Sequence, residues 1–334
     1  MDREYANKGL SGLVNLGNTC WLNSAVQIVS NIRPLTDYFF SGDFKEDINI
    51  RSKEYRFVIE WLKLLKGLWS SNCTIQPISF HRTFNHFFDG GLYSQEDSEE
   101  GLSKILDLLH EGMSYEVDIK FNGMPKNKTD VLMIESIKSW NNSFKKSYSK
   151  IVELFYGQYL SCVKCMTCGY ESNTFEPFSI IQLPIKEGFN DINDCFSHFV
   201  KTEKLEKDEL WDCSKCHSCE ESHKKILLWK SPFILIIQLK RFDYLHNCKI
   251  NTDISYPLTN FNLTNYIDGY DKMESLYNLV GIIEHIGSLG GGHYISHIKN
   301  ENNKWYTYDD NHVYELNKQS VNQKQGYILV YQKI

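Results

Sequence analysis

The stretch Asn15-Leu16-Gly17-Asn18-Thr19-Cys20-Trp21-Leu22-Asn23-Ser24 passes from a turn into a helix. Gly17 and Asn18 are residue types that tight turns favour, and an apolar stripe of helical period begins at Leu22. Cys20 is therefore expected in the first helical turn, where unpaired amide groups and the helix dipole favour the thiolate. This makes Cys20 a candidate nucleophile, with a buried structural cysteine as the alternative.

A nucleophilic thiolate needs a base, and the base needs a group that orients it. His293 is the best-placed histidine, because three glycines precede it and a strand-like alternation follows it; His285 is second. Asp309 and Asp310 end the next strand-like run, and antiparallel pairing would bring one of these carboxylates to the imidazole. Asn15 offers an amide that can donate to an oxyanion, or it simply caps its own turn.

The patterning changes from helical to strand-like near Leu160. Apolar stripes predict three helices before that point, and the third is expected to open at Ser94, with Glu96 and Asp97 in its first turn. Residues 122–142 lack clear periodicity and are expected to form a surface excursion. Short β-rich runs after Leu160 predict one mostly antiparallel sheet. These runs cover residues 178–183, 226–229, 233–239, 277–286, 293–298, 305–308 and 327–331.

The composition is that of a folded globular protein. The 334 residues include 42% hydrophobic and 23% charged side chains, close to ordinary globular usage. A net charge of −6 and the lack of a basic run argue against nucleic acid as a partner. No apolar run approaches the ~20 residues of a membrane span, and the first ten residues lack the apolar core of a signal peptide. We therefore expect a soluble protein that is not secreted.

The ten cysteines include two C-x-x-C pairs. Cys165 with Cys168 and Cys213 with Cys216 provide four thiolates, which are the ligand set of a tetrahedral structural zinc. Reduced thiols without a metal are the alternative, because the two pairs lie far apart in the sequence. Three further residues extend the pairs and could supply other ligands or, with six cysteines in all, a second metal: Cys162, Cys219 and His217.

Five segments occur in an order that is typical of one family. The first is residues 12–24 around Cys20, and the last runs from Tyr277-Asn278-Leu279 through Gly292-His293-Tyr294 to Trp305-Tyr306-Thr307-Tyr308-Asp309-Asp310. Between them lie Gln95-Glu96-Asp97-Ser98-Glu99-Glu100, Leu154-Phe155-Tyr156-Gly157-Gln158 and Leu239-Lys240-Arg241-Phe242. By these motifs the chain resembles the ubiquitin-specific protease family of papain-like cysteine peptidases over nearly its whole length.

The resemblance implies an α+β papain-like fold in the shape of a right hand. A helical thumb, an antiparallel palm sheet and zinc-stabilised β fingers are its parts. It implies an N-terminal tail over residues 1–8 and one catalytic domain over residues 9–334. The boundaries that follow are 9–155 for the thumb, 156–250 for the inserted fingers, and 170–200 with 226–334 for the palm.

The resemblance also implies roles for individual residues. Cys20 is the nucleophile, His293 the general base and Asn15 the oxyanion donor. Asp309 is the orienting acid, with Asp310 as the second candidate. The residues expected to bind substrate are Gln95, Asp97, Glu100, Gly292 and Tyr294, although an acidic helix start also accounts for Asp97 and Glu100. One structural zinc ion is implied at Cys165, Cys168, Cys213 and Cys216.

The implied activity is deubiquitination, the hydrolysis of the bond after the C-terminal glycine of ubiquitin through a Cys20 thioester. Ubiquitin and ubiquitinated proteins are then the expected partners of a monomeric eukaryotic enzyme in the cytoplasm or nucleus, with no nucleic acid or membrane partner. The alternatives are a peptidase for another ubiquitin-like modifier, a ubiquitin-binding pseudoenzyme and a zinc-ribbon nucleic-acid binder.

Overall fold

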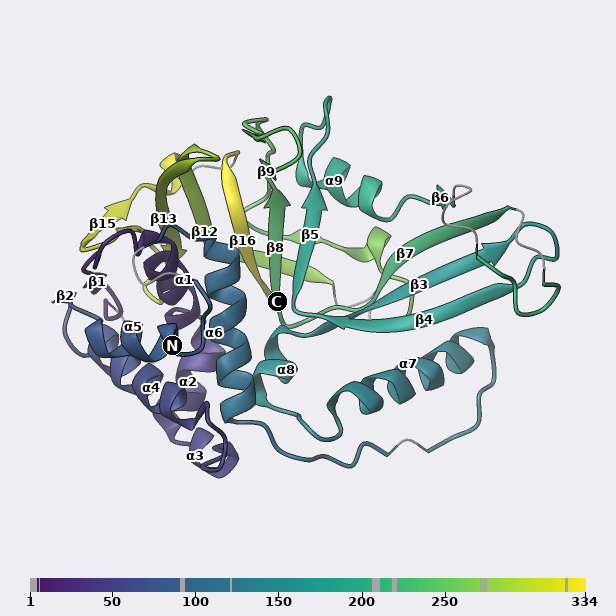
Figure 1. Ribbon diagram of the computed structural model, residues 1–334, viewed down its shortest axis with the longest axis horizontal. Helices are drawn as coiled ribbons and strands as arrows, with labels where there is room; N and C mark the ends of the chain where they lie inside the picture. The colour runs from purple at the N-terminus through teal and green to yellow at the C-terminus, as the bar shows by residue number, and fades with distance from the viewer. Residues whose placement is uncertain are drawn as a thin grey trace.

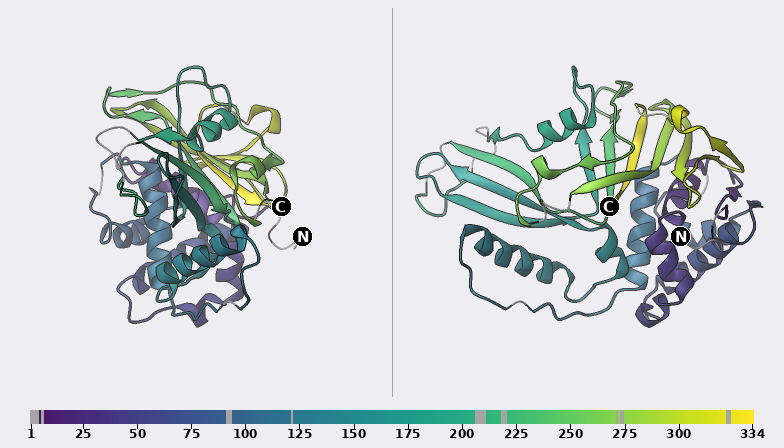
Figure 2. Two further views of the ribbon diagram at one scale, coloured as in Figure 1. Left: turned by 90° about the vertical axis from the view of Figure 1, so that its right-hand side faces the viewer. Right: turned by 180° about the vertical axis from the view of Figure 1, so that it is seen from behind.

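A large β-sheet forms the centre of the protein, and the N-terminal helices pack on one of its faces (Figure 1). The computed structural model describes residues 5, 7–90, 94–120, 122–205, 211–217, 221–270, 272, 275–321 and 324–334. A second, smaller sheet projects away from the N-terminal helices, as the view from behind also shows (Figure 2). The described chain is thus a mixed α+β protein, as predicted.

Helices make up most of the chain before residue 156. The helices before this residue are α1 Cys20–Ser30, α2 Arg33–Ser41, α3 Phe44–Asp47, α4 Tyr55–Ser70, α5 Ile78–Asn85, α6 Ser98–Gly112, α7 Lys128–Phe144 and α8 Lys150–Phe155. The described residues after it include α9 Ile192–Phe199 and the short 3-10 helices η2 Thr264–Tyr266 and η4 Lys318–Ser320. The stripes that start at Leu22, Val58 and Leu102 lie in α1, α4 and α6 and are buried, so these three helices are confirmed.

Helix α6 begins at Ser98 and not at Ser94, so the predicted start is wrong. Asp97 is its N-cap, and the carboxylate accepts a hydrogen bond from the backbone N–H of Glu99 at 2.8 Å. An aspartate in this position satisfies an unpaired amide and also suits the positive end of the helix dipole. Ser94 donates instead to the carboxylate of Glu96. Asp97 is therefore fixed at the helix N-terminus rather than inside the first turn.

Residues 128–144 form helix α7, where the sequence predicted a surface excursion. Asn127 caps this helix by accepting a hydrogen bond from the backbone N–H of Asp130 at 2.8 Å. Its buried side chains include only two large apolar residues, Trp140 and Phe144, both near its C-terminal end. The apolar stripe is therefore too sparse to predict the helix, and the cap was the better signal.

The large sheet has the strand order β15-β14-β13-β12-β16-β8-β5, with β11 paired to β12. Its pairs are antiparallel except for β5, which runs parallel to β8. The strands are β5 Ile180–Pro184, β8 Ile234–Lys240, β11 Phe261–Asn262, β12 Leu276–Ser288, β13 Gly291–Lys299, β14 Trp305–Asp309, β15 His312–Leu316 and β16 Gly326–Lys333.

A four-stranded sheet of order β4-β3-β7-β6 forms the projection. The prediction of one sheet is therefore wrong, because the run 226–229 belongs to β7 in this second sheet. Its strands are β3 Gly157–Cys165, β4 Glu171–Phe178, β6 Glu203–Lys204 and β7 Ser222–Lys230. Two small pairs complete the strands of the described chain: β1 Gly12–Leu13 with β2 Thr74–Ile75, and β9 Phe242–Asp243 with β10 Cys248–Lys249.

The two faces of the large sheet bury separate cores. Ile283 on β12 faces α1, α4 and α6, whereas its neighbour Ile282 faces α9 on the other side. This alternation is the period of two that a strand imposes. Gly281 lets α1 approach β12 closely, because a Cβ there would lie 2.5 Å from the side chain of Ile28. The close contact places the C-terminal half of α1 against the sheet.

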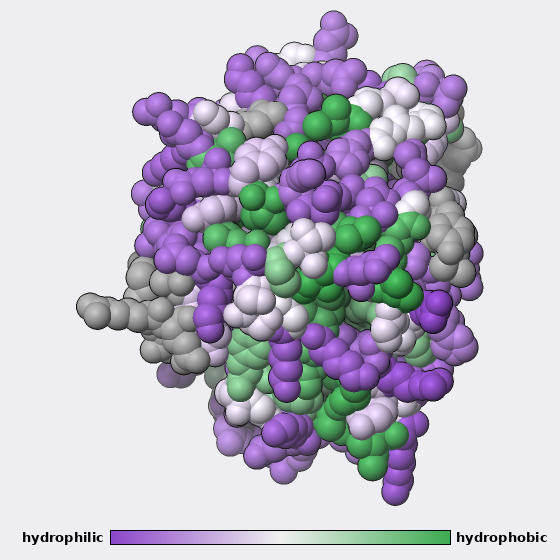
Figure 3. Space-filling view, turned by 90° about the vertical axis from the view of Figure 1, so that its left-hand side faces the viewer, coloured by the Kyte–Doolittle hydropathy of each residue, from purple (hydrophilic) through white to green (hydrophobic). Residues whose placement is uncertain are grey.

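The outer face at the left of Figure 1 is mostly hydrophilic, with a band of hydrophobic residues near its centre (Figure 3). Such a surface agrees with helices whose apolar stripes are turned toward the core. Among the described residues, no helix combines the length and the apolar character needed to cross a lipid bilayer.

Candidate active site

Cys20 is the first residue of α1 and its side chain is buried, with an exposed fraction of 3%. Burial raises the pKa of the thiol, and the charge of Asp310 adds to this effect. Hydrogen bonds from backbone N–H groups, chiefly that of Tyr294, act in the opposite direction but are outweighed. The expected position in the first turn is therefore confirmed, but in this state burial prevails over the helix N-terminus and favours the thiol.

His293 lies near the start of β13 and contacts Asp309 at the end of β14. The distance from His293 Nε2 to Asp309 Oδ1 is 2.6 Å, and both side chains are partly exposed. Because Nε2 is engaged by the carboxylate, Nδ1 is the ring nitrogen left for a proton from a substrate or nucleophile. The structure thus brings together the predicted base and the predicted orienting acid.

Cys20 lies against the strand that carries this histidine, since Tyr294 is the next residue after His293. Within the described residues, no hydrogen bond joins Cys20 Sγ to the His293 ring. Contacts of this kind are often long in unliganded enzymes and shorten when substrate binds. The nucleophile and the base therefore lie on neighbouring elements, α1 and β13.

Asp310 has a different set of partners from Asp309. Its carboxylate accepts one hydrogen bond from Asn15 Nδ2 at 2.9 Å and another from Asn23 Nδ2 at 2.7 Å. The Asn15 side-chain oxygen is also engaged, since it accepts from the backbone N–H groups of Gly17 and Thr19. The Asn15 amide is therefore fixed in orientation, with one N–H still available to a ligand.

Asn23 was not predicted as a site residue, although the sequence contains a signal for its role. This polar side chain is buried on a helix whose other side chains are mostly apolar. Buried amides almost always find a partner, so a polar residue on the apolar stripe pointed to a specific contact. Its partner, Asp310, lies too far along the chain for spacing to reveal.

Gln95 binds the glycine-rich hairpin between β12 and β13. Its side-chain amide donates to the carbonyl of Gly292 at 3.1 Å and accepts from the N–H of the same residue at 3.3 Å. A Cβ at Gly292 would lie 2.3 Å from His285 Nε2 and 2.4 Å from the carbonyl of Ile286, so only glycine fits. Both residues were predicted to bind substrate, and the structure places each in contact with the other.

A cavity of about 260 Å³ lies beside the contact between Gln95 and Gly292. We call it the tail channel. Glu96, Asp97 and Glu100 line it from the start of α6, whereas Phe242, Tyr244 and Tyr294 line it from the sheet side. Its remaining lining residues are Gln95, His285, Leu289, Gly290 and Gly291. An acidic, aromatic and glycine-lined channel suits an extended, basic peptide with small residues.

Asp97 is held in the channel wall by the large sheet. Tyr327 on β16 donates its hydroxyl hydrogen to the carboxylate, and Gln238 on β8 donates in turn to the Tyr327 oxygen at 2.6 Å. Burial raises the pKa of Asp97, while the bonds from Tyr327 and from the Glu99 amide lower it. This relay couples the start of α6 to two strands, and sequence patterning gave no sign of it.

His285, the second candidate base, lies in a different environment from His293. Its ring packs on Tyr294 at a centroid distance of 4.6 Å, and burial with the nearby Lys249 lowers its pKa to about 4. Among the described groups, its Nδ1 atom has no hydrogen-bond partner. Without a carboxylate on its ring, His285 lacks the orienting group that a general base needs.

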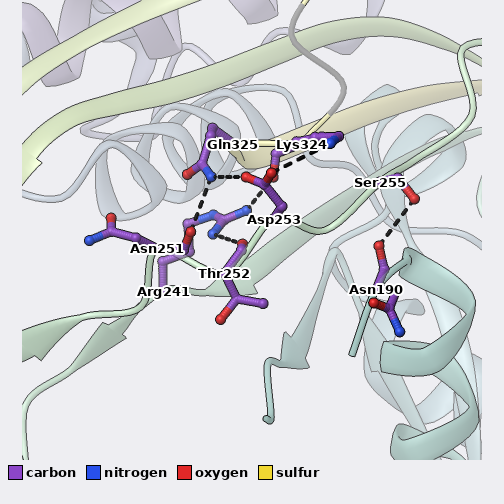
Figure 4. Close-up of polar contacts among 8 residues, drawn as sticks. All are labelled: Asn190, Arg241, Asn251, Thr252, Asp253, Ser255, Lys324 and Gln325. Atoms are coloured by element: carbon purple, nitrogen blue, oxygen red, sulfur yellow. Dashed lines mark hydrogen bonds and ion pairs between the residues drawn. The ribbon is translucent and has the colours of Figure 1, made fainter. Parts of the chain in front are cut away.

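Arg241 fixes the segment that carries Phe242 into the channel (Figure 4). Its guanidinium is fully buried and donates to four backbone carbonyls, at distances of 2.8 to 3.1 Å. These acceptors belong to Ile250, Thr252, Lys324 and Gly326. The guanidinium thus links the segment after β10 to the start of β16. Four carbonyl acceptors account for an arginine in the motif Leu239-Lys240-Arg241-Phe242.

Four cysteines meet at the far end of the four-stranded sheet. The sulfurs of Cys165, Cys168, Cys213 and Cys216 all lie within 4.8 Å of one another. Two of the separations, Cys165 to Cys216 and Cys168 to Cys213, are 3.7 Å. A tetrahedral ion with Zn–S bonds of about 2.3 Å holds sulfurs about 3.8 Å apart, so the cluster can hold one metal ion.

The other proposed ligands stand apart from this cluster. In the part of the chain that the structure describes, Cys162 and His217 are not members of it, and Cys219 lies outside the described residues. The backbone N–H of Cys168 is the chief cause that lowers the pKa of Cys165 to about 6, which favours the thiolate form that metals bind.

Comparison with known proteins identifies the family of the chain. The sequence profile described as "Ubiquitin carboxyl-terminal hydrolase" matches residues 11–331. The chain belongs to the ubiquitin carboxyl-terminal hydrolase family. Two human members of the family are similar to it: Ubiquitin carboxyl-terminal hydrolase 21, with 32% identity over 352 residues, and Ubiquitin carboxyl-terminal hydrolase 2, with 31% over 338 residues. Both alignments cover 97% of this chain, but only 61% and 55% of the two relatives. The chain therefore spans less than two thirds of either hydrolase.

Solved structures in the hydrolase family share the fold. One is the SAGA DUB module of Ubp8, in a cysteine-to-alanine form, with Sgf11, Sus1 and Sgf73, bound to monoubiquitin. It matches with a TM-score of 0.79 and 26% identity over 99% of this chain and 70% of that chain. The same module bound to ubiquitin aldehyde matches with a TM-score of 0.78, 26% identity and the same coverage. The α+β fold that the resemblance implied is confirmed.

The acidic first turn of α6 predicts a pH effect on stability. Burial, followed by the charges of Asp97, Glu100 and Asp107, raises the pKa of Glu99 to about 7. The folded state then binds more protons than the unfolded state between about pH 4.3 and 7, so stability falls as pH rises through this window. Glu99→Gln removes that loss, and we expect the variant to gain urea resistance over the parent at pH 8 but little at pH 5.

The matched control is Glu187→Gln, which changes an exposed carboxylate after β5. The difference in urea resistance between this variant and the parent should be the same at pH 5 and at pH 8. A Glu99→Gln difference that is equally large at pH 5 and pH 8 would contradict the assignment.

Proposed function

We propose that the protein is a thiol-dependent deubiquitinase that hydrolyses the bond after the C-terminal glycine of ubiquitin. The observation that carries the proposal is the meeting of three groups beside the tail channel. These groups are Cys20 at a helix N-terminus, the His293–Asp309 pair and the Asn15 amide held by Asp310. Membership of the hydrolase family supports the same reaction.

The geometry supports a definite order of proton and bond changes. His293 takes the proton from Cys20 at Nδ1, since Asp309 engages Nε2, and the resulting thiolate sulfur attacks the carbonyl carbon of the terminal glycine. The C–N bond then breaks, and the imidazolium returns the proton to the leaving amine. Water, activated by the same histidine, attacks the thioester, releasing the carboxylate and the Cys20 thiol. Asp309 keeps its charge throughout and stabilises the imidazolium.

Asn15 is suited to the negative oxygen that forms in each attack. Its free N–H is the kind of donor that oxyanion sites use, and its orientation is set before substrate arrives. We assign Asp310 to positioning this amide, and Asp309 to positioning His293. The two adjacent acids therefore position different residues of the same site.

The channel supports ubiquitin as the modifier. Gly290 and Gly291 line the channel with backbone, and a Cβ at Gly292 would lie 2.3 Å from His285 Nε2, another residue of the lining region. A wall of glycine backbone suits a tail of glycines. Asp97 and Glu100 are placed to pair with arginines of a basic tail by charge-assisted bonds. The Ubp8 structures bound to monoubiquitin and to ubiquitin aldehyde add support for ubiquitin rather than another modifier.

We also propose that zinc is the metal held by the four cysteines. Their sulfur separations match tetrahedral coordination, and four thiolates are a soft, closed ligand set typical of structural zinc. When bound, the ion supplies cross-linking and no chemistry. It would tie β3 to the segment before β7, where the four-stranded sheet has little core of its own.

Replacing the nucleophile tests the activity. With ubiquitin carrying a C-terminal fluorophore, the parent should release the dye and Cys20→Ala should lose at least about a thousandfold in rate. Cys73→Ala, which changes an exposed cysteine, is the matched control and should keep the parent's rate. Equal rates for parent and Cys20→Ala would contradict the proposal. Fluorogenic forms of other ubiquitin-like modifiers, assayed in parallel, test the choice of modifier.

Separate substitutions test the division between the two acids. Asp309→Asn should reduce kcat about 10²- to 10⁴-fold, because the imidazole loses the carboxylate that orients it. Asp310→Asn should reduce kcat about 10- to 100-fold, because the Asn15 amide loses the carboxylate that holds it. Adding Asp310→Asn to Asn15→Ala should then cost little more, whereas multiplicative losses would show that the two residues act independently.

Metal analysis tests the zinc site. The purified protein should contain about one zinc ion per chain, and Cys168→Ser should lose it together with several degrees of melting temperature. Cys162→Ser, on the same strand pair but outside the cluster, should keep the metal. A content near zero or near two in the parent would contradict a single zinc site.

A further inference from the structure

Helices α4 and α5 lie side by side at the edge of the protein opposite the four-stranded sheet (Figure 1). A groove of about 490 Å³ lies between them, and we call it the α4–α5 groove. Its lining residues on α4 recur at helical spacing from Tyr55 to Lys63, so they form one face of the helix about 12 Å long. Within the described residues, the groove shares no lining residue with the tail channel.

Two arginines line the groove from different helices, Arg56 on α4 and Arg82 on α5. Both side chains are exposed, and across the part of the chain that the structure describes neither forms an ion pair with a carboxylate. The carboxylate of Glu60, also in the lining, already has two partners. It accepts from Lys63 Nζ at 2.6 Å and from Ser79 Oγ at 2.7 Å. The groove therefore presents two guanidinium groups whose charge is not cancelled within it.

An apolar surface accompanies these charges. Ile59 and Phe87 are half-buried side chains in the lining, and the ring of Tyr55 lines the groove with them. A half-buried apolar surface still loses contact with water when a partner covers it, which stabilises the complex. The α4–α5 groove thus combines an apolar floor with two donors that pair with carboxylates.

The charge around the groove differs from that of the whole chain. Residues 51–90 contain six Lys or Arg and three Asp or Glu, a net charge of +3, whereas the chain as a whole carries −6. Two guanidinium groups are too few to follow a phosphate backbone, which argues against nucleic acid. An inorganic anion would pair with the arginines but leave the apolar floor uncovered. A peptide with acidic and apolar side chains satisfies both parts of the groove.

We propose that the α4–α5 groove binds an acidic segment of a partner protein. One large apolar side chain of the segment covers Ile59 and Phe87, and carboxylates on either side of it pair with Arg56 and Arg82. A length of about 12 Å accommodates about eight residues of helix or four of extended chain. Arginine suits this task because its planar donors bind a carboxylate in pairs. The inference is independent of the proposed function, since it concerns binding alone.

The groove is connected to the helix that carries the nucleophile. Phe88, the residue after Phe87, packs on Trp21 with a ring-centroid distance of 5.3 Å, and Trp21 follows Cys20 in α1. A partner held in the groove therefore binds the same helical layer as Cys20 and leaves the lining of the tail channel uncovered. A partner that also binds another protein would raise the local concentration of that protein near the candidate site.

Selection from a peptide library tests the proposal. Random peptides of about twelve residues are selected on the purified parent protein, and those recovered are labelled with a fluorophore. We expect peptides in which Asp and Glu flank one Phe, Leu or Trp. Their affinity should fall about 10- to 100-fold in the double variant Arg56→Glu with Arg82→Glu, and affinity for the parent should fall as ionic strength rises. The milder pair Arg56→Gln with Arg82→Gln should give a smaller loss in the same direction.

The matched control is Arg51→Glu with Lys66→Glu. It makes the same change of charge on exposed residues that lie before and on α4 but outside the lining. The control should keep the parent's affinity for the peptides. Release of a C-terminal fluorophore from ubiquitin should be equal in the parent and all variants, because neither arginine belongs to the candidate site. A parent without that activity would contradict the proposed function and leave the binding result standing.

Three outcomes would overturn the inference. In the first, every selected peptide binds the parent and the Arg56→Glu with Arg82→Glu variant equally well. In the second, the control loses as much affinity as the test variant, so that only the overall charge matters. In the third, acidic peptides are not recovered, and a labelled single-stranded oligonucleotide binds the parent but not the test variant, which assigns the groove to nucleic acid.

Discussion

The carboxylate of Asp310 joins the two ends of the chain. It binds Asn15 before α1 and Asn23 inside α1, across 295 and 287 positions of sequence, and its backbone carbonyl accepts from Leu13 N–H at 2.8 Å. Asp310 can do this because it lies in the left-handed region at φ +49° after the last residue of β14. Its carboxylate thereby contacts Asn15 and Asn23, while a carboxylate oxygen stays within 4.8 Å of the facing atoms of Asp309 and His293. One turn therefore sets both the oxyanion donor and the base.

Each element of the candidate site depends on a partner from elsewhere in the fold. Gln95, ahead of α6, orders the hairpin before His293, while Tyr327 on β16 holds the N-cap of α6. Arg241 completes the arrangement with four carbonyl partners and a full positive charge, although its direct hydrogen-bond partners are all neutral. Buried networks of this kind specify one geometry, because burying a polar group that lacks some of its hydrogen bonds costs more free energy than burying an apolar group. The channel and the His293–Asp309 pair are therefore held by contacts that several elements share.

Much of this could be predicted from the sequence, and the failures have physical reasons. Motif order located Cys20, His293 and Asp309, since each motif is local and compact. The start of α6 was misplaced because Ser94 and Asp97 are both good caps, and only the tertiary bond from Tyr327 favours Asp97. Helix α7 was missed because few of its side chains are buried. The division into two sheets was missed because a period of two predicts strands but does not name their partners.

The position of β16 in the large sheet governs the order in which the protein can assemble. This strand, Gly326–Lys333, lies between β12 and β8, so a segment that follows all the other strands in sequence fills the middle of the sheet. Until it arrives, β12 and β8 have no common neighbour, and Asp97 lacks the hydroxyl that fixes it. Contacts of such long range form late and slowly. The sheet and the channel wall are therefore completed together, when β16 pairs with both of its neighbours.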